Sequence, residues 1–175
     1  QTSSVTRGLI FREQLGGDGL EDRGGEINYG LERIMAKQKS DGSFGYWDRF
    51  DRVVDKYQPY AIETLVMGLP YAKDEDAVRR SIRKGLEYIY RHNDGDLQTK
   101  MYSYGVLAES GYEVTSRVRY AVDVLLKNKL DTLGAELLAS AAEILRLTEE
   151  KSQLKDSAGT LALQADKFIK SDSPR

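Results

Sequence analysis

The chain lacks cysteine altogether and has a single histidine among its 175 residues. The absence of cysteine excludes disulfides, thiolate zinc sites and a cysteine nucleophile within this chain, but it does not reveal the compartment. No hydrophobic run approaches the roughly 18 apolar residues that a membrane-spanning helix needs. We therefore expect no membrane span in this segment.

An excess of charge of either sign is also missing. The sequence has 26 basic and 28 acidic residues, for a net charge of −2. A chain without a basic surplus has no electrostatic case for a nucleic-acid or anionic-membrane partner. With 31% charged and 40% hydrophobic residues, the composition is typical of one soluble globular domain with a sizeable core. We predict a single domain over residues 1–175 and, because the chain starts at Gln1 without a methionine, a fragment of a larger multidomain protein.

Most of the chain has the pattern of amphipathic helices. Apolar residues recur three or four positions apart, and no stretch alternates with period two for long enough to form a strand. This pattern predicts an all-α protein, whose short connections favour antiparallel helical hairpins. The expected helices are 2–14, 26–37, 59–68, 75–91, 97–110, 114–127, 133–147 and 152–169.

Several residues mark the ends and faces of these helices. Pro59 suits a first helical turn, where its missing N–H has no partner to lose. Asp74 is a typical N-cap for the helix 75–91, and Gly111 suits the position after the helix 97–110. The side chains expected toward the core in the helix 2–14 are Val5, Leu9 or Ile10, and Phe11.

The stretch 27–47, INYGLERIMAKQKSDGSFGYW, is the most informative part of the sequence. Its apolar helix runs to Gln38, and Asp41-Gly42 then favours a turn, because glycine accepts positive φ and aspartate bonds nearby backbone. A group of aromatic residues follows at once: Phe44, Tyr46 and Trp47. We therefore expect an amphipathic helix that delivers aromatic side chains to a defined place.

A second segment repeats part of this pattern. Gly85-Leu86-Glu87 echoes Gly30-Leu31-Glu32, and Asn93 follows at the same offset as Gln38. A match that spans a helix and its turn indicates two copies of one helical hairpin. A chance match between two amphipathic helices is the alternative.

The turn at residues 38–47, with glutamine, Asp-Gly, an aromatic residue and then Gly-aromatic-Trp, resembles the turn repeated in α/α-toroid proteins. These include terpene cyclases, prenyltransferase β subunits and the thioester domains of α2-macroglobulins and complement. Over nearly the whole chain, the order of motifs is similar to the thioester-containing domain of bacterial α2-macroglobulins. Three further segments carry this resemblance: Pro59-Tyr60-Ala61, the Gly-Tyr step within 109–114, and the leucine-rich helix 133–147. The resemblance implies antiparallel hairpins that form part or all of an α/α toroid.

The opening residues Gln1-Thr2-Ser3-Ser4 resemble the end of the family's thioester motif, in which a cysteine and two further residues precede a glutamine. Gln1 is therefore the candidate acyl partner of a thioester. The alternative is that these four residues are a helix cap or a cloning remnant. Without a cysteine, this chain cannot form the thioester bond by itself.

The aromatic residues near the turn are the other candidate site. Besides Gln38 of the turn, the residues that could line a shallow central concavity are Phe44, Tyr46, Trp47, Tyr57 and Tyr60. Packing at the inner end of a toroid is the alternative. The lone His92 is interpreted as a surface or capping residue. No cluster has metal-ligand spacing, so we expect no metal and no cofactor.

The resemblance implies a helical domain of a bacterial α2-macroglobulin-like endopeptidase inhibitor, which is cleaved in a bait region, changes shape and entraps the protease. The implied partners are neighbouring domains of the parent protein and target proteases, and the implied location is periplasmic or extracellular. Each inhibitor molecule would acylate a protein nucleophile only once, so we expect that this chain is not an enzyme. The alternatives are a fragment of a terpene cyclase or prenyltransferase-like enzyme, and a helical-repeat protein-binding module.

Overall fold

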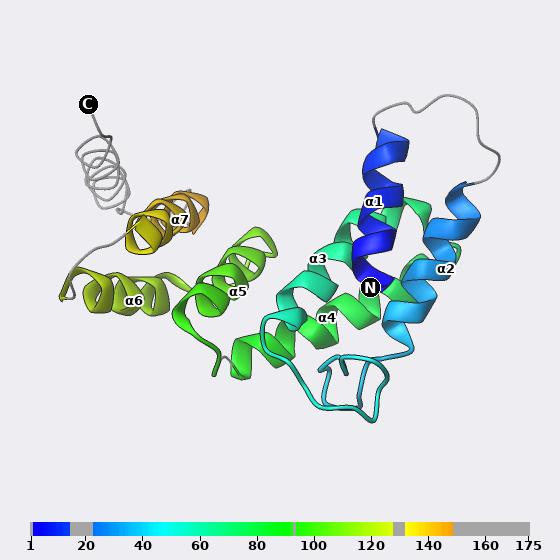
Figure 1. Ribbon diagram of the computed structural model, residues 1–175, viewed down its shortest axis with the longest axis horizontal. Coiled ribbons are helices and arrows are strands. Elements are labelled where there is room, and N and C mark those ends of the chain that lie inside the picture. The colour runs from blue at the N-terminus through cyan, green and yellow to red at the C-terminus, as the bar shows by residue number, and fades with distance from the viewer. Residues whose placement is uncertain (1, 15–22, 93, 128–131, 149–175) are drawn as a thin grey trace. The chain divides into compact units, whose positions relative to one another are not determined.

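The computed structural model describes residues 2–14, 23–92, 94–127 and 132–148. In this part of the chain there are seven α-helices, one short 3₁₀ helix and no strand, which confirms the all-α prediction (Figure 1). None of the helices described is long and apolar enough to cross a membrane. The elements are α1 (Thr2–Gln14), α2 (Arg23–Met35), α3 (Tyr57–Gly68), η1 (Leu69–Tyr71), α4 (Glu75–Arg91), α5 (Leu97–Glu109), α6 (Thr115–Lys127) and α7 (Thr132–Thr148).

The chain divides into two compact units, residues 1–94 and 95–175. In the first unit α1 packs on α2 and α3, and α3 packs on α4. In the second unit α7 packs on both α5 and α6. Each unit is therefore a small helical assembly, while the single domain and the toroid remain predictions. The expected helix 152–169 and the expected acyl residue Gln1 lie outside the described residues.

The helix boundaries follow the local signals closely. Asp74 caps α4 through its Oδ1, which accepts a hydrogen bond from the Ala77 N–H at 2.9 Å. Gly111 has φ +83° just after α5, a left-handed conformation that glycine adopts without steric cost. Helix α3 begins at Tyr57, so Pro59 lies within its first turn.

The expected core face of α1 is wrong for two residues. Ile10 is fully buried, but Val5 is 63% exposed and Phe11 is 51% exposed. The buried stripe instead consists of Ser3, Thr6 and Ile10, which are three and four residues apart and share one helix face. Small polar side chains occupy this face because α2 comes close to it.

Glycines allow this close approach in both hairpins of the first unit. A Cβ on Gly30 of α2 would lie 2.2 Å from the Thr6 Oγ1 of α1, and a Cβ on Gly85 of α4 would lie 2.8 Å from the Ile62 Cγ1 of α3. The two glycines, matched by the repeat in the sequence, thus occupy equivalent places against the preceding helix. This equivalence favours two copies of one hairpin over a chance match.

Candidate functional site

The loop between α2 and α3 carries the Asp-Gly turn, drawn in cyan below the helices in Figure 1. Asp41 Oδ1 accepts hydrogen bonds from the Ser43 N–H at 2.9 Å and the Ser43 hydroxyl at 2.7 Å. Gly42 has φ +94°, and a Cβ there would lie 2.3 Å from the Lys84 carbonyl oxygen of α4. The turn at Asp41-Gly42 is therefore confirmed, and it lies directly against α4.

Replacing Asp41 by alanine is expected to lower the free energy of unfolding by about 1 kcal/mol at neutral pH, because two hydrogen bonds are lost. Burial raises the pKa of Asp41, but the Ser43 hydroxyl and N–H, with Lys39 and His92, outweigh it and hold the pKa below its ordinary value of 3.8. A lowered folded pKa means that the stabilisation is present above pH 3.8 and is lost as the pH falls through the folded pKa.

Urea unfolding at neutral pH and at pH 3 measures this effect. The difference between wild type and D41A should shrink at the lower pH. The control is Asp94→Ala, an exposed aspartate of the same unit, for which we expect a change within about 0.5 kcal/mol at both pH values. A difference between wild type and D41A that is the same at both pH values would contradict the role given to the carboxylate.

Gln38, a predicted site residue, ties the turn to α4. Its Nε2 donates to the Gly42 carbonyl at 3.1 Å and to the Ser81 carbonyl at 2.9 Å, and its Oε1 accepts from the Ser81 hydroxyl at 2.8 Å. All these contacts are internal. Gln38 is half-buried, and its hydrogen bonds position the loop against α4.

Phe44 is fully buried, so its proposed place on an open concavity is corrected to the core. The Phe44 N–H donates to Gln58 Oε1 at 2.7 Å, and Gln58 Nε2 donates to the carbonyls of Phe44 at 2.9 Å and Val54 at 3.1 Å. Gln58 is itself buried in α3. This side chain replaces the backbone partners that a loop lacks, and it fixes the loop against α3.

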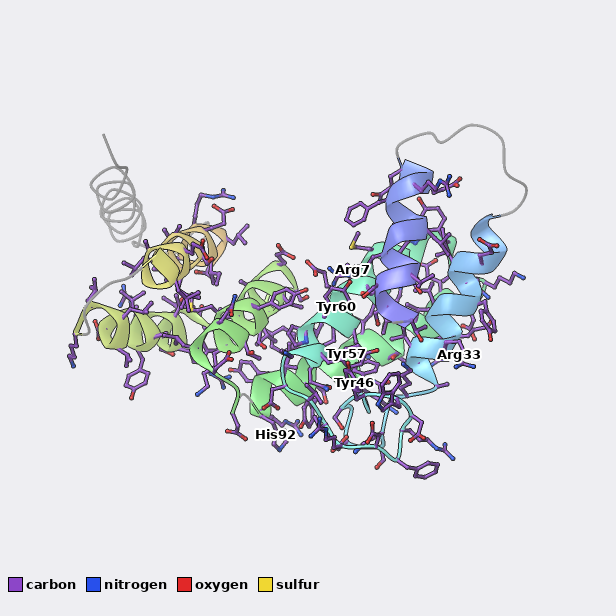
Figure 2. The ribbon with its side chains drawn as sticks, viewed as in Figure 1. Arg7, Arg33, Tyr46, Tyr57, Tyr60 and His92 are labelled. Atoms are coloured by element: carbon purple, nitrogen blue, oxygen red, sulfur yellow. The ribbon has the colours of Figure 1, made fainter. Side chains whose placement is uncertain are left out.

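Three tyrosines gather where the loop and α3 meet the first turn of α1. We call Tyr46, Tyr57 and Tyr60 the tyrosine cluster; Figure 2 labels all three. The rings of Tyr46 and Tyr57 meet edge to face at 5.9 Å. The Tyr57 hydroxyl lies 3.0 Å from Ser3 Oγ, and the Tyr60 hydroxyl donates to Ser4 Oγ at 3.4 Å.

Trp47 lies at the outer edge of this cluster. Its ring meets Tyr46 edge to face at 5.0 Å, yet the residue is 64% exposed. Of the aromatic residues expected at the concavity, the structure thus brings Tyr46, Tyr57 and Tyr60 together at the start of α1. It leaves Trp47 largely in solvent and places Phe44 in the core.

Burial extends the pH range over which the Tyr57 hydroxyl keeps its proton. Desolvation raises the pKa of Tyr57; the hydrogen bond with Ser3 opposes this effect, and Tyr46 and Tyr60 add to it. A pKa above the ordinary value of 10 means that the Tyr57 hydroxyl is neutral near pH 7. The group can therefore donate or accept a hydrogen bond beside α1 without bringing a negative charge.

Arg7 of α1 binds to three residues of α3 beside the cluster. Its guanidinium donates to Thr64 Oγ1 at 2.7 Å, to the Tyr60 carbonyl at 2.8 Å and to Glu63 Oε2 at 2.5 Å. It also lies 3.6 Å from the centroid of the Tyr60 ring, in a cation–π contact. Arg7 therefore fixes the position of Tyr60, a role with no sequence signal because its partners are more than 50 residues away.

A second residue that sequence reasoning missed is Lys37, which follows the last turn of α2. Only 7% of this residue is exposed. Its Nζ lies 3.5 Å from Thr2 Oγ1 and 5.9 Å from the centroid of the Tyr57 ring. Burial, followed by the positive charge of Arg33, lowers the pKa of Lys37 below its ordinary value of 10.5. A buried cation thus sits under the cluster, at the first residue of α1.

The remaining candidates have other roles. His92 is the exposed C-cap residue of α4, and its ring stacks on Tyr88 with centroids 4.8 Å apart, as expected for a surface or capping residue. Across the described ranges, no group of three or more His, Asp or Glu residues could hold a metal ion.

A groove of about 630 Å³ lies between α1 and α2. Its wall includes Val5, which accounts for the exposure of that side chain. The lining residues are Thr2, Val5, Thr6, Leu9, Gly25, Glu26, Tyr29 and Gly30. None of the residues expected to line a concavity belongs to this groove.

Comparisons with protein-family models, with curated proteins and with solved structures gave no match. The resemblance to bacterial α2-macroglobulins therefore depends on the sequence alone, at residues 1–4, 38–47, 59–61, 109–114 and 133–147.

Proposed function

We propose that this chain is the helical domain of an α2-macroglobulin-like protease inhibitor and that it shelters an acyl group carried by Gln1. The observation that supports the proposal most is the position of the tyrosine cluster. Tyr57 and Tyr60 lie against Ser3 and Ser4 in the first turn of α1, and Gln1 directly precedes that turn in the sequence. The cluster that the loop and α3 supply thus lies against the helical turn that directly follows, in the sequence, the residue where the family motif has its acyl group.

Aromatic shelter suits the chemistry of a thioester. In the proposed parent protein, a cysteine upstream of this segment would be joined through sulfur to the side-chain carbonyl carbon of Gln1. Water attacks such a bond, so apolar rings that exclude water extend its lifetime. A neutral Tyr57 hydroxyl fits this role, because a phenolate would be a competing nucleophile.

Release of the acyl group would follow cleavage of the bait by a protease. An amine of the attacking protease adds to the acyl carbon of Gln1, the carbon–sulfur bond breaks, and the thiol leaves with the proton that the amine gives up. Each molecule reacts once, so the activity is capture and not turnover. The proposal places the parent protein in the periplasm or outside the cell, with neighbouring domains and target proteases as its partners.

Methylamine tests the covalent step, because it is a small amine that enters sheltered thioesters. The full-length parent protein is incubated with methylamine and digested, and the peptide that contains Gln1 is analysed by mass spectrometry. We expect a methylamide on the Gln1 side chain and one newly free thiol per molecule. A folded parent protein that gains neither the adduct nor the thiol would exclude the covalent function.

Removing a ring from the tyrosine cluster should accelerate the reaction with methylamine. In the parent protein, Tyr57→Ala is expected to raise the rate of methylamine uptake by about tenfold, which corresponds to about 1.4 kcal/mol of lost protection. The matched control is Tyr120→Ala, since Tyr120 is an exposed tyrosine of α6. Equal rates in wild type and Y57A would show that the cluster does not shelter the acyl group.

A further inference from the structure

The far end of the loop between α2 and α3 exposes aromatic side chains. We call residues 46–52 the loop tip; it lies at the edge of the first unit (Figure 1). Phe50 is 82% exposed, Trp47 is 64% exposed and Tyr46 is 41% exposed. Exposed apolar side chains that gather at one place on a protein mark an interaction site. The proposed shelter uses Tyr46 but gives no role to the two larger exposed surfaces, those of Trp47 and Phe50.

The loop tip is held in shape by its own carboxylates. The Asp48 carboxylate accepts hydrogen bonds from the N–H of Phe50 at 2.7 Å and of Asp51 at 3.1 Å. The Asp51 carboxylate accepts from the N–H of Trp47 at 3.1 Å and of Arg52 at 2.8 Å. These four backbone donors already have partners, so moving the tip into a layer with little water leaves none of them unpaired.

The two arginines of the loop tip present their charge to solvent. Arg49 is exposed, and its guanidinium lies 4.8 Å from the centroid of the Phe50 ring, in a cation–π contact. Arg52 is exposed as well. Within the described ranges neither guanidinium forms an ion pair, since the carboxylates of the tip bond to backbone N–H groups. Guanidinium groups bind phosphate oxygens through paired N–H donors. The tip thus combines apolar rings with two groups that suit phosphate.

This combination fits the interface of a phospholipid bilayer. Tryptophan and tyrosine are enriched at that level of the membrane, where the ring is in an apolar layer and the polar end is in water. Long basic side chains there extend to the headgroups. A protein partner would have to offer a cavity shaped for the rings, whereas a bilayer accepts a projecting tip without a matching shape. The paired backbone donors also favour the bilayer, because the lipid layer offers them no acceptors.

We infer that the loop tip binds the surface of a phospholipid bilayer, with the rings of Trp47 and Phe50 inserted below the headgroups. The guanidinium groups of Arg49 and Arg52 then lie at the level of the lipid phosphates. The tip has two acidic and two basic residues, and the whole chain has a net charge of −2. Long-range attraction to anionic lipid is therefore absent, and burial of the rings drives the binding. This inference is independent of the proposed covalent function, because it requires no thioester.

Fluorescence of Trp47, the only tryptophan of the chain, measures its insertion directly. The full chain is titrated with vesicles of phosphatidylcholine and with vesicles that also contain phosphatidylglycerol. With both compositions we expect a saturable blue shift of the emission and weaker quenching by acrylamide, and little effect of added sodium chloride. Absence of these changes with both vesicles would overturn the inference and leave a protein as the partner of the tip. Binding that requires phosphatidylglycerol and is abolished by sodium chloride would also overturn it, because charge attraction needs no inserted ring.

Variants of Phe50 assign the binding to the ring. Phe50→Ala is expected to weaken binding about tenfold in co-sedimentation with phosphatidylcholine vesicles, because the apolar surface that enters the bilayer is lost. Phe50→Leu keeps an apolar side chain and should retain most of the affinity. The matched control is Tyr29→Ala, which removes a ring that is 61% exposed in the groove between α1 and α2 and should leave binding unchanged. Circular dichroism verifies the fold of each variant. Equal binding by wild type and F50A would refute the site.

Discussion

Replacing Phe44 by alanine is expected to lower the free energy of unfolding of residues 1–94 by about 3–5 kcal/mol. The ring is fully buried, and a Cβ on Gly85 would lie 3.1 Å from its Cε2. Deleting the ring removes its contacts with α4 and leaves a cavity that the close glycine contact cannot fill, because the helix backbone would have to move. The loop would then lose the anchor that fixes Tyr46, two residues farther along the chain.

Urea unfolding followed by tryptophan fluorescence measures this loss. Trp47 is the only tryptophan of the chain and lies in the same loop, so it reports on the first unit. The matched control is Phe50→Ala, because Phe50 belongs to this loop and is 82% exposed; we expect a change within about 0.5 kcal/mol. Similar effects of F44A and F50A would show that Phe44 does not belong to the core.

Replacing Gln58 by alanine is expected to cost about 3–5 kcal/mol as well, through lost hydrogen bonds. Gln58 pairs both the N–H and the carbonyl of Phe44 and also the carbonyl of Val54. Each buried polar group left without a partner costs about 1–3 kcal/mol. The Val54 carbonyl keeps the Tyr57 N–H as a partner at 3.0 Å, so the expected loss comes mainly from the N–H and the carbonyl of Phe44.

Two comparisons separate hydrogen bonding from packing. Gln58→Met keeps most of the volume and should still lose most of the stability, while Gln14→Ala, at an exposed position in α1, should change it by less than about 0.5 kcal/mol. Hydrogen exchange of the Phe44 amide should accelerate in both Gln58 variants. A Q58M protein as stable as wild type would show that volume, and not hydrogen bonding, explains the role of Gln58.

The prediction for Phe44 concerns a residue whose role differs from the expected one. Phe44 is expected at an aromatic concavity and Gln38 in the turn, because the turn at 38–47 resembles that of toroid proteins. In the structure Phe44 is a core residue, and Gln38 bonds to the turn and to Ser81. The pattern indicated that these residues matter for the loop, but it did not distinguish a side chain that faces inward from one that faces a surface.

Residues with distant partners were missed for a different reason. The guanidinium of Arg7 meets Glu63 and Thr64, and Lys37 meets Thr2. The partners in these contacts are too far apart in the sequence for a single helix or turn to bring them together, so no local pattern predicts the contacts. Val5 and Phe11 fit the apolar pattern of α1, but the prediction that they are buried is wrong. The reason is that α2 and α3 cover the face of α1 that carries Ser3, Thr6 and Ile10.

The sequence by itself determined the all-α class, the bounds of most helices, the cap at Asp74 and the turn at Asp41-Gly42, because each of these depends on interactions within a few residues along the chain. The tertiary structure alone decided which face of α1 is buried, that Tyr46, Tyr57 and Tyr60 meet at its first turn, and that Lys37 lies beneath them. The physical reason is that helix packing brings together groups far apart in the sequence, and burial then changes the cost of each charge and hydrogen bond.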